Sequence, residues 1–246
     1  MPDAQQGLEI VQRLALVGQA AEQVLEPVRN PVAVGVGIIA FDEVPHAVAV
    51  GVNRAAVGVD LDASAAEEVV DAEGRWLTPG LWDIHTHLDL EVELDPGLTE
   101  VVRHGTTTAV VANCSIGVPF GRQNVDGHDP VVSCFARVEN IPKSVLRRVA
   151  DKITWDDPKS YLEHFEHMPL GANIVPMIPH SMLRIEAMGL DRAISEPPTE
   201  DDLAKMEAIL DEAMKDGYAG FSTDMLPFHY LSDDPHREIR IPANHA

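Results

Sequence analysis

Residues 76–117 read WLTPGLWDIHTHLDLEVELDPGLTEVVRHGTTTAVVANCSIG, and this stretch decides the fold. We expect a buried strand over residues 76–87 and a short helix over residues 98–104. Residues 106–113 form a near-continuous apolar and β-branched run, which is typical of a parallel strand covered on both faces. A strand, a helix and a second strand in this order indicate a parallel α/β arrangement.

The pattern continues toward the C-terminus. Residues 172–179 and 219–224 read as a third and a fourth strand. Between them, Thr199 and Asp202 resemble a capping box that starts a helix, and Gly217 is placed to end it. Residues 126–157 are expected to be a long loop with helical pieces. The sequence therefore predicts a parallel sheet with right-handed crossovers.

The first part of the chain has a different pattern of apolar residues. Apolar residues at three- and four-residue steps predict a helix over residues 8–25. Short glycine-punctuated runs predict a small sheet with strands at residues 32–40, 46–52 and 55–61. We therefore divide the chain into two parts. Residues 1–75 are expected to form a helix and a small β-rich segment, and residues 76–246 the parallel α/β part.

Composition excludes several classes of function. The chain has 246 residues and a formal net charge of −22, which disfavours nucleic-acid and anionic-membrane partners. Two cysteines are too few for a disulfide scaffold. The longest apolar run, residues 31–41, is shorter than the roughly 18 residues of a membrane span, and no secretory signal is visible. We expect a cytoplasmic protein that acts on a small molecule. Its oligomeric state is not readable.

Histidines mark the end of the first strand. Side chains alternate along a strand, so Asp83, His85 and His87 share one face, while Ile84 is expected to face the helices. Two imidazoles at this spacing converge on one point, and a divalent metal such as zinc accounts for that arrangement. The alternative is that these are polar residues at a strand end, satisfied by the backbone.

Other polar residues follow the later strands at the same end of the sheet. Cys114 ends the second strand and can supply a thiolate to zinc, although a single cysteine is more often a small buried hydrophobe. His180 ends the third strand, and Ser222, Thr223 and Asp224 end the fourth. Parallel sheets bind ligands at this end, so these four are candidates for lining a substrate pocket, and His180, Ser222 and Thr223 are the candidate substrate-binding residues. Helix capping is the alternative for Ser222, Thr223 and Asp224.

Residues 76–117 resemble the amidohydrolase superfamily, and the Asn113-Cys114 pair is similar to its N-acyl-D-amino-acid deacylase (D-aminoacylase) branch. The resemblance continues through residues 170–173, 180–189 and 217–223. It implies the first half, about four strands, of a TIM-like (β/α)8 metal-dependent hydrolase barrel. It also implies a hydrolase of non-peptide amide C–N bonds that acts on N-acyl-D-amino acids.

The same resemblance implies the site residues. Cys114 would help to hold a tightly bound Zn²⁺, and His85 and His87 would serve a second, weaker metal position. The general-base Asp and the remaining histidine ligands of the family match no residue here, so they are expected beyond residue 246. Residues 1–52 also depart from the family pattern.

Two alternatives remain open. A hydantoinase or dihydroorotase type of amidohydrolase shares the HxH strand but uses a carbamylated Lys on the fourth strand, and residues 219–224 contain no Lys. The second alternative is that the chain is a truncated fragment without catalytic activity. A half barrel leaves strand edges with unpaired backbone groups, which favours aggregation or dimerisation.

Overall fold

The computed structural model describes residues 38–39, 47–51, 54–57, 68–71, 76–77, 80–121, 123 and 128–245. Its first elements are short antiparallel strands. They are β1 (Ile38–Ile39) with β5 (Trp76–Leu77), and β2 (Ala47–Gly51) between β3 (Arg54–Val57) and β4 (Glu68–Asp71). The predicted helix over residues 8–25 lies outside the described residues.

The centre of the molecule is a parallel sheet, as predicted. Its strands follow the order β6 (Leu81–Asp83), β7 (Thr106–Val111) and β8 (Asn173–Pro176). A second parallel pair is formed by β9 (Ile178–Pro179) and β10 (Phe221–Ser222). The predicted strand over residues 172–179 is therefore split at Met177, because its first half pairs with β7 and its second half with β10. The first half of a (β/α)8 barrel goes beyond these pairings and stays a prediction.

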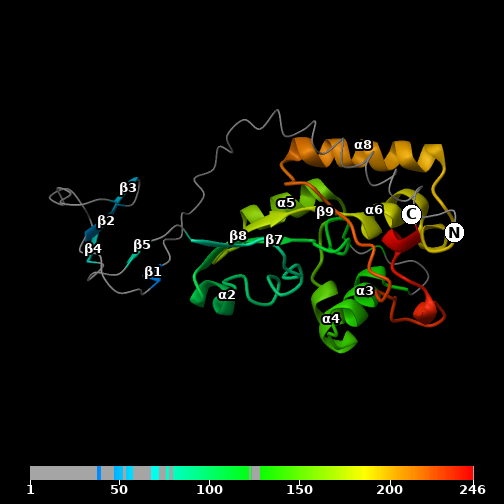
Figure 1. Ribbon diagram of the computed structural model, residues 1–246, viewed down its shortest axis with the longest axis horizontal. Helices are drawn as coiled ribbons and strands as arrows, with labels where there is room; N and C mark the ends of the chain where they lie inside the picture. Colours follow the sequence, from blue (N-terminus) through cyan, green and yellow to red (C-terminus); the bar gives the residue numbers. More distant parts are fainter. Residues whose placement is uncertain are drawn as a thin grey trace.

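Helices flank the parallel strands. In Figure 1, α5 and α8 lie above the sheet, and α2, α3 and α4 lie below it. The helices are α2 (Thr99–Arg103), α3 (Pro130–Val138), α4 (Lys143–Ala150), α5 (Pro158–Glu166), α6 (His180–Met188), α7 (Leu190–Ala193) and α8 (Glu200–Asp216), with 3-10 turns η2 (His236–Glu238) and η3 (Pro242–His245). None of the helices within the described residues combines the length and apolar character that a membrane crossing requires.

Helix α8 begins and ends where the sequence predicts. The amide of Asp202 donates to the Thr199 hydroxyl at 3.2 Å, and the Asp202 carboxylate accepts from the Thr199 amide at 2.9 Å. Gly217 ends the helix with a φ of 116°. Two amides at the N-terminus are thus satisfied by side chains, and glycine adopts the left-handed C-terminal conformation without a Cβ penalty.

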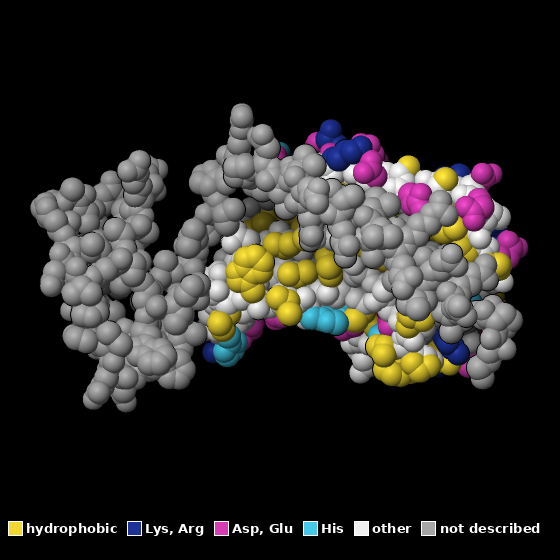
Figure 2. Space-filling model, turned by 45° about the horizontal axis from the view of Figure 1, so that its top comes forward, with side chains coloured by type: hydrophobic (Ala, Val, Ile, Leu, Met, Phe, Trp, Pro, Cys, Tyr) yellow, Lys and Arg dark blue, Asp and Glu magenta, His cyan; other side chains and the backbone are white. Residues whose placement is uncertain are grey.

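The apolar core lies among the helices, whereas β6 is exposed. Phe135, Tyr161 and Leu210 are fully buried in that core. On β6 and just after it, Trp82 is 66% exposed and Ile84 is 71% exposed, so the expectation that Ile84 faces the helices is wrong. In the described part of the chain β6 pairs with β7 along one edge, and no helix covers Ile84. Figure 2 shows hydrophobic side chains gathered on one face of the molecule.

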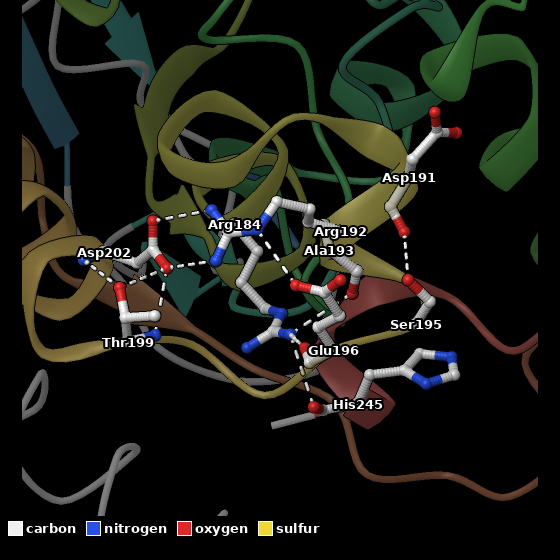
Figure 3. Close-up of polar contacts among 9 residues, drawn as sticks. All are labelled: Arg184, Asp191, Arg192, Ala193, Ser195, Glu196, Thr199, Asp202 and His245. Atoms are coloured by element: carbon white, nitrogen blue, oxygen red, sulfur yellow. Dashed lines mark hydrogen bonds and ion pairs between the residues drawn. The ribbon is translucent and has the colours of Figure 1, made fainter.

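A buried arginine joins three segments at the C-terminal side of α6. Arg184 is fully buried, and its Nη2 donates to the carbonyls of Ala193, Glu196 and His245 at 3.1–3.3 Å (Figure 3). Beside it, Arg192 binds the Asp202 carboxylate with both terminal nitrogens, at 3.1 and 2.7 Å. These contacts fix α6, α7 and η3 to the start of α8.

Candidate metal centre

The segment His85-Thr86-His87 is attached to β7 through its central residue, Thr86. The amide of Thr86 donates to the Val110 carbonyl at 3.2 Å, and the Thr86 hydroxyl donates to the same oxygen at 2.7 Å. Thr86 is buried, so the histidines on either side of it project to the other face of the chain. Backbone pairing therefore brings His85 and His87 to the carboxyl end of β6.

The loop that carries Cys114 is strained and is held by hydrogen bonds. Ala112, Cys114 and Ser115 have φ values of 62°, 49° and 65°, in the left-handed region that costs a non-glycine residue about 1–2 kcal/mol. The Asp89 carboxylate accepts from the Ala112 amide at 3.2 Å. The Ser222 hydroxyl accepts from the Ser115 amide at 3.2 Å and donates to the Ala112 carbonyl at 2.5 Å. Groups from two other segments thus hold the conformation that presents Cys114.

The structure brings three predicted residues together. His85 Nε2 lies 2.9 Å from Cys114 Sγ, and one donor atom from each of His85, His87 and Cys114 lies within 4.8 Å of the others. His85 is exposed, and the other two are half-buried. This nitrogen, nitrogen and sulfur donor set is open on one side, as expected of a cation site that also admits a ligand.

The pKa shifts of His87 and Cys114 bear on cation binding. Burial, with a smaller contribution from His85, lowers the pKa of His87 to about 4, so its ring is neutral at neutral pH. His87 Nδ1 is buried and has no hydrogen-bond partner among the described residues. Burial and the nearby Asp224 and Glu139 charges raise the pKa of the Cys114 thiol, and a bound cation opposes that shift by stabilising the thiolate. A neutral imidazole and a thiolate are the forms that bind zinc.

Further acidic and histidine side chains lie near these three residues. Glu139 Oε1 lies 3.4 Å from His87 Nε2. The buried Asp224 carboxylate contacts His229 Nδ1 and accepts from the Leu226 amide at 2.7 Å. The His229 side chain is only 11% exposed. Asp224 was predicted at this end of the sheet from its position after a strand, whereas no sequence motif marks Glu139.

The three candidate substrate-binding residues use their polar groups inside the protein. His180 is fully buried, and its Nδ1 lies 2.9 Å from the Thr223 hydroxyl. Burial lowers the pKa of His180 to about 3, with a smaller contribution from Arg184. The Ser222 hydroxyl is engaged with the loop before and after Cys114, as described above. A role of these residues in substrate binding stays a prediction.

A separate carboxylate and histidine pair lies outside this group. His164 Nε2 is 2.9 Å from Glu93 Oε1, and the His164 ring packs on Trp155 with centroids 4.6 Å apart. His164 is half-buried and contacts both of these side chains.

The chain is similar in sequence to a protein family and to several known proteins. Residues 68–240 match the model of the amidohydrolase family. An uncharacterized protein of Mycobacterium tuberculosis is 41% identical over 189 residues, which cover 76% of this chain and 30% of that protein. The N-acyl-D-glutamate deacylase of Alcaligenes xylosoxydans xylosoxydans is 31% identical over 176 residues, covering 71% of this chain and 32% of that enzyme. The chain thus spans about a third of the length of these curated relatives.

A solved structure is similar over most of the chain. It is that of a D-aminoacylase mutant in complex with CuCl2, with a TM-score of 0.56 and 27% sequence identity. The likeness covers 78% of this chain and 34% of the solved one.

Proposed function

The chain belongs to the amidohydrolase family, and we propose that it carries the metal-binding part of a zinc-dependent hydrolase that cleaves the amide bond of N-acyl-D-amino acids. The observation that carries the proposal is the convergence of His85, His87 and Cys114, with donor atoms within 4.8 Å of one another. The similarity to an N-acyl-D-glutamate deacylase and to a D-aminoacylase supports the choice of an N-acyl-D-amino acid as substrate.

The proposed architecture follows from the same relationship. We assign residues 76–246 to the first half of a (β/α)8 barrel and residues 1–75 to a separate N-terminal segment. Barrel enzymes place their active sites at the carboxyl ends of the strands. The end of β6 and the loop after β7 are such positions, and they carry the two histidines and Cys114.

Each residue has a distinct role in the proposed centre. When bound, zinc polarises a carbonyl and makes water more acidic. His85 and His87 offer imidazole nitrogens, and Cys114 offers a thiolate. The proposed centre has one tight metal position and a second, weaker one. Asp89 and Ser222 keep the Cys114 loop in its left-handed conformation and therefore keep the thiol beside His85.

An alternative within the family is hydrolysis of cyclic amides by a hydantoinase-like or dihydroorotase-like enzyme. Such enzymes bridge two metals with a carbamylated Lys on the fourth barrel strand. The segment around β10 reads AGFSTD over residues 219–224 and contains no Lys. This observation favours the deacylase.

An assay of amide hydrolysis tests the proposal. The longest protein encoded in frame with this chain is loaded with zinc and incubated with N-acetyl-D-amino acids, their L-enantiomers and a cyclic ureide. We expect release of free D-amino acids, and loss of that release in the Cys114→Ala variant. Turnover of the cyclic ureide without release of D-amino acids contradicts the proposal. For residues 1–246 alone we expect weak or no activity.

A further inference from the structure

One end of α3 faces a single histidine of the metal centre. Glu139 is the C-terminal cap of α3, and its Oε1 lies 3.4 Å from His87 Nε2. Phe135, four residues earlier, meets the same ring edge-on, with centroids 6.3 Å apart and planes at 86°. Residues four apart share one face of a helix, so α3 presents an aromatic ring and a carboxylate together to His87.

The two nitrogens of His87 have different surroundings. The Nε2 side faces the Glu139 carboxylate, which can only accept a proton when it is ionised. The Nδ1 atom is buried, and within the part of the chain that the structure describes it has no hydrogen-bond partner. A neutral imidazole carries one N–H and one lone pair, so a carboxylate beside Nε2 favours the proton there and leaves the lone pair on Nδ1.

We propose that Glu139 is a positioning residue of the metal centre, which fixes the ring orientation and tautomer of His87 and thereby sets the affinity for a divalent cation. The inference rests on the metal centre of the proposed function and adds a residue to it. Carboxylate groups behind metal-bound histidines act in this way in other proteins, and their removal typically weakens metal binding 10–100-fold.

The surroundings of Glu139 suit this role. Its side chain is 26% exposed and that of His87 is 14% exposed, so water screens the contact only in part. Phe135 is fully buried and packs edge-on against the same ring. The position of the carboxylate is itself set by α3, whose N-terminus is capped by Asp129 through the Val132 amide at 3.2 Å.

The chain offers a matched control. Glu93 and His164 form a second carboxylate and histidine pair, 2.9 Å apart, and neither residue belongs to the cluster of His85, His87 and Cys114. Removing the Glu93 carboxylate takes away the same kind of contact without touching the proposed centre.

The test is a Co²⁺ titration of the purified chain, with the dissociation constant obtained by competition against a chelator. We expect Glu139→Ala to weaken Co²⁺ binding roughly 10–100-fold and Glu139→Gln to weaken it less, because glutamine keeps an acceptor oxygen beside His87 Nε2. Glu93→Gln is expected to bind Co²⁺ as the wild type does. The spectrum at saturation, including the absorption of the Cys114 thiolate bound to cobalt, is expected to be the same in all these variants.

Three results overturn the inference. Wild-type affinity in both Glu139 variants contradicts it, and so does an equal loss of affinity in Glu93→Gln. A changed cobalt spectrum at saturation in the Glu139 variants makes Glu139 a direct ligand instead. The His87→Ala variant distinguishes a failure of the proposed metal centre from a failure of the role proposed for Glu139. If His87→Ala binds Co²⁺ like the wild type, the metal centre itself is wrong. If only the Glu139 variants behave like the wild type, the inference alone fails.

Discussion

Replacement of Ser222 by alanine removes one hydroxyl that connects β10 to the Cys114 loop. The hydroxyl accepts from the Ser115 amide at 3.2 Å and donates to the Ala112 carbonyl, and Ser222 is only 7% exposed. Ser222→Ala therefore leaves a buried amide without this partner, which costs about 1–3 kcal/mol. Because that bond also helps to hold Cys114 at positive φ, part of the loop strain is released in the variant.

We expect Ser222→Ala to lower the free energy of unfolding by about 2 kcal/mol and to weaken zinc binding, because Cys114 is no longer held beside His85. Urea unfolding of the metal-free protein measures the first effect, and zinc titration measures the second. Ser144→Ala, at an exposed position of α4, serves as the control and is expected to match the wild type. If Ser222→Ala has wild-type stability and wild-type zinc affinity, the hydroxyl does not hold the loop and the reasoning is refuted.

Three further predictions concern the scaffold. A Cβ on Gly171 would lie 1.9 Å from the Gly97 carbonyl oxygen, so Gly171→Ala should lower the free energy of unfolding, measured by thermal unfolding, by about 1–3 kcal/mol. Gly220→Ala, where a Cβ would meet open space, should lower it little. Burial holds the pKa of His180 near 3 against 6.5 when exposed, so the unfolded state binds more protons below pH 6.5. The free energy of unfolding should therefore fall on acidification, by about 2 kcal/mol from this residue at pH 5, and His180→Gln should reduce that slope in urea titrations. Asp202→Asn loses the bidentate guanidinium contact and weakens the α8 cap (Figure 3); a loss of about 1–2 kcal/mol is expected in urea unfolding, and wild-type stability would contradict it.

Local signals in the sequence were sufficient for the main elements. Thr199 and Gly217 delimit α8 because capping depends on residues within one turn of the helix end. The strand over residues 106–111 was visible because both faces of a covered parallel strand are apolar. His85, His87 and Cys114 could be grouped because each follows a strand, and parallel strands end at one edge of the sheet.

Residues that reach the site from segments other than the strand ends carry no local sequence signal. Glu139 comes from the end of α3, in a segment predicted only as a loop with helical pieces, and its contact with His87 depends on how α3 packs. His229 reaches Asp224 through a loop that follows β10. The exposure of Ile84 was also missed, because alternation along a strand shows which residues share a face but not what covers that face.

We infer that His85, His87 and Cys114 form a zinc centre, and zinc-edge X-ray absorption of the loaded protein is the direct test of that inference. We predict a sulfur shell at about 2.3 Å together with nitrogen at about 2.0–2.1 Å, and loss of the sulfur shell in the Cys114→Ser variant. A zinc environment without sulfur, or one that Cys114→Ser leaves unchanged, would contradict the claim.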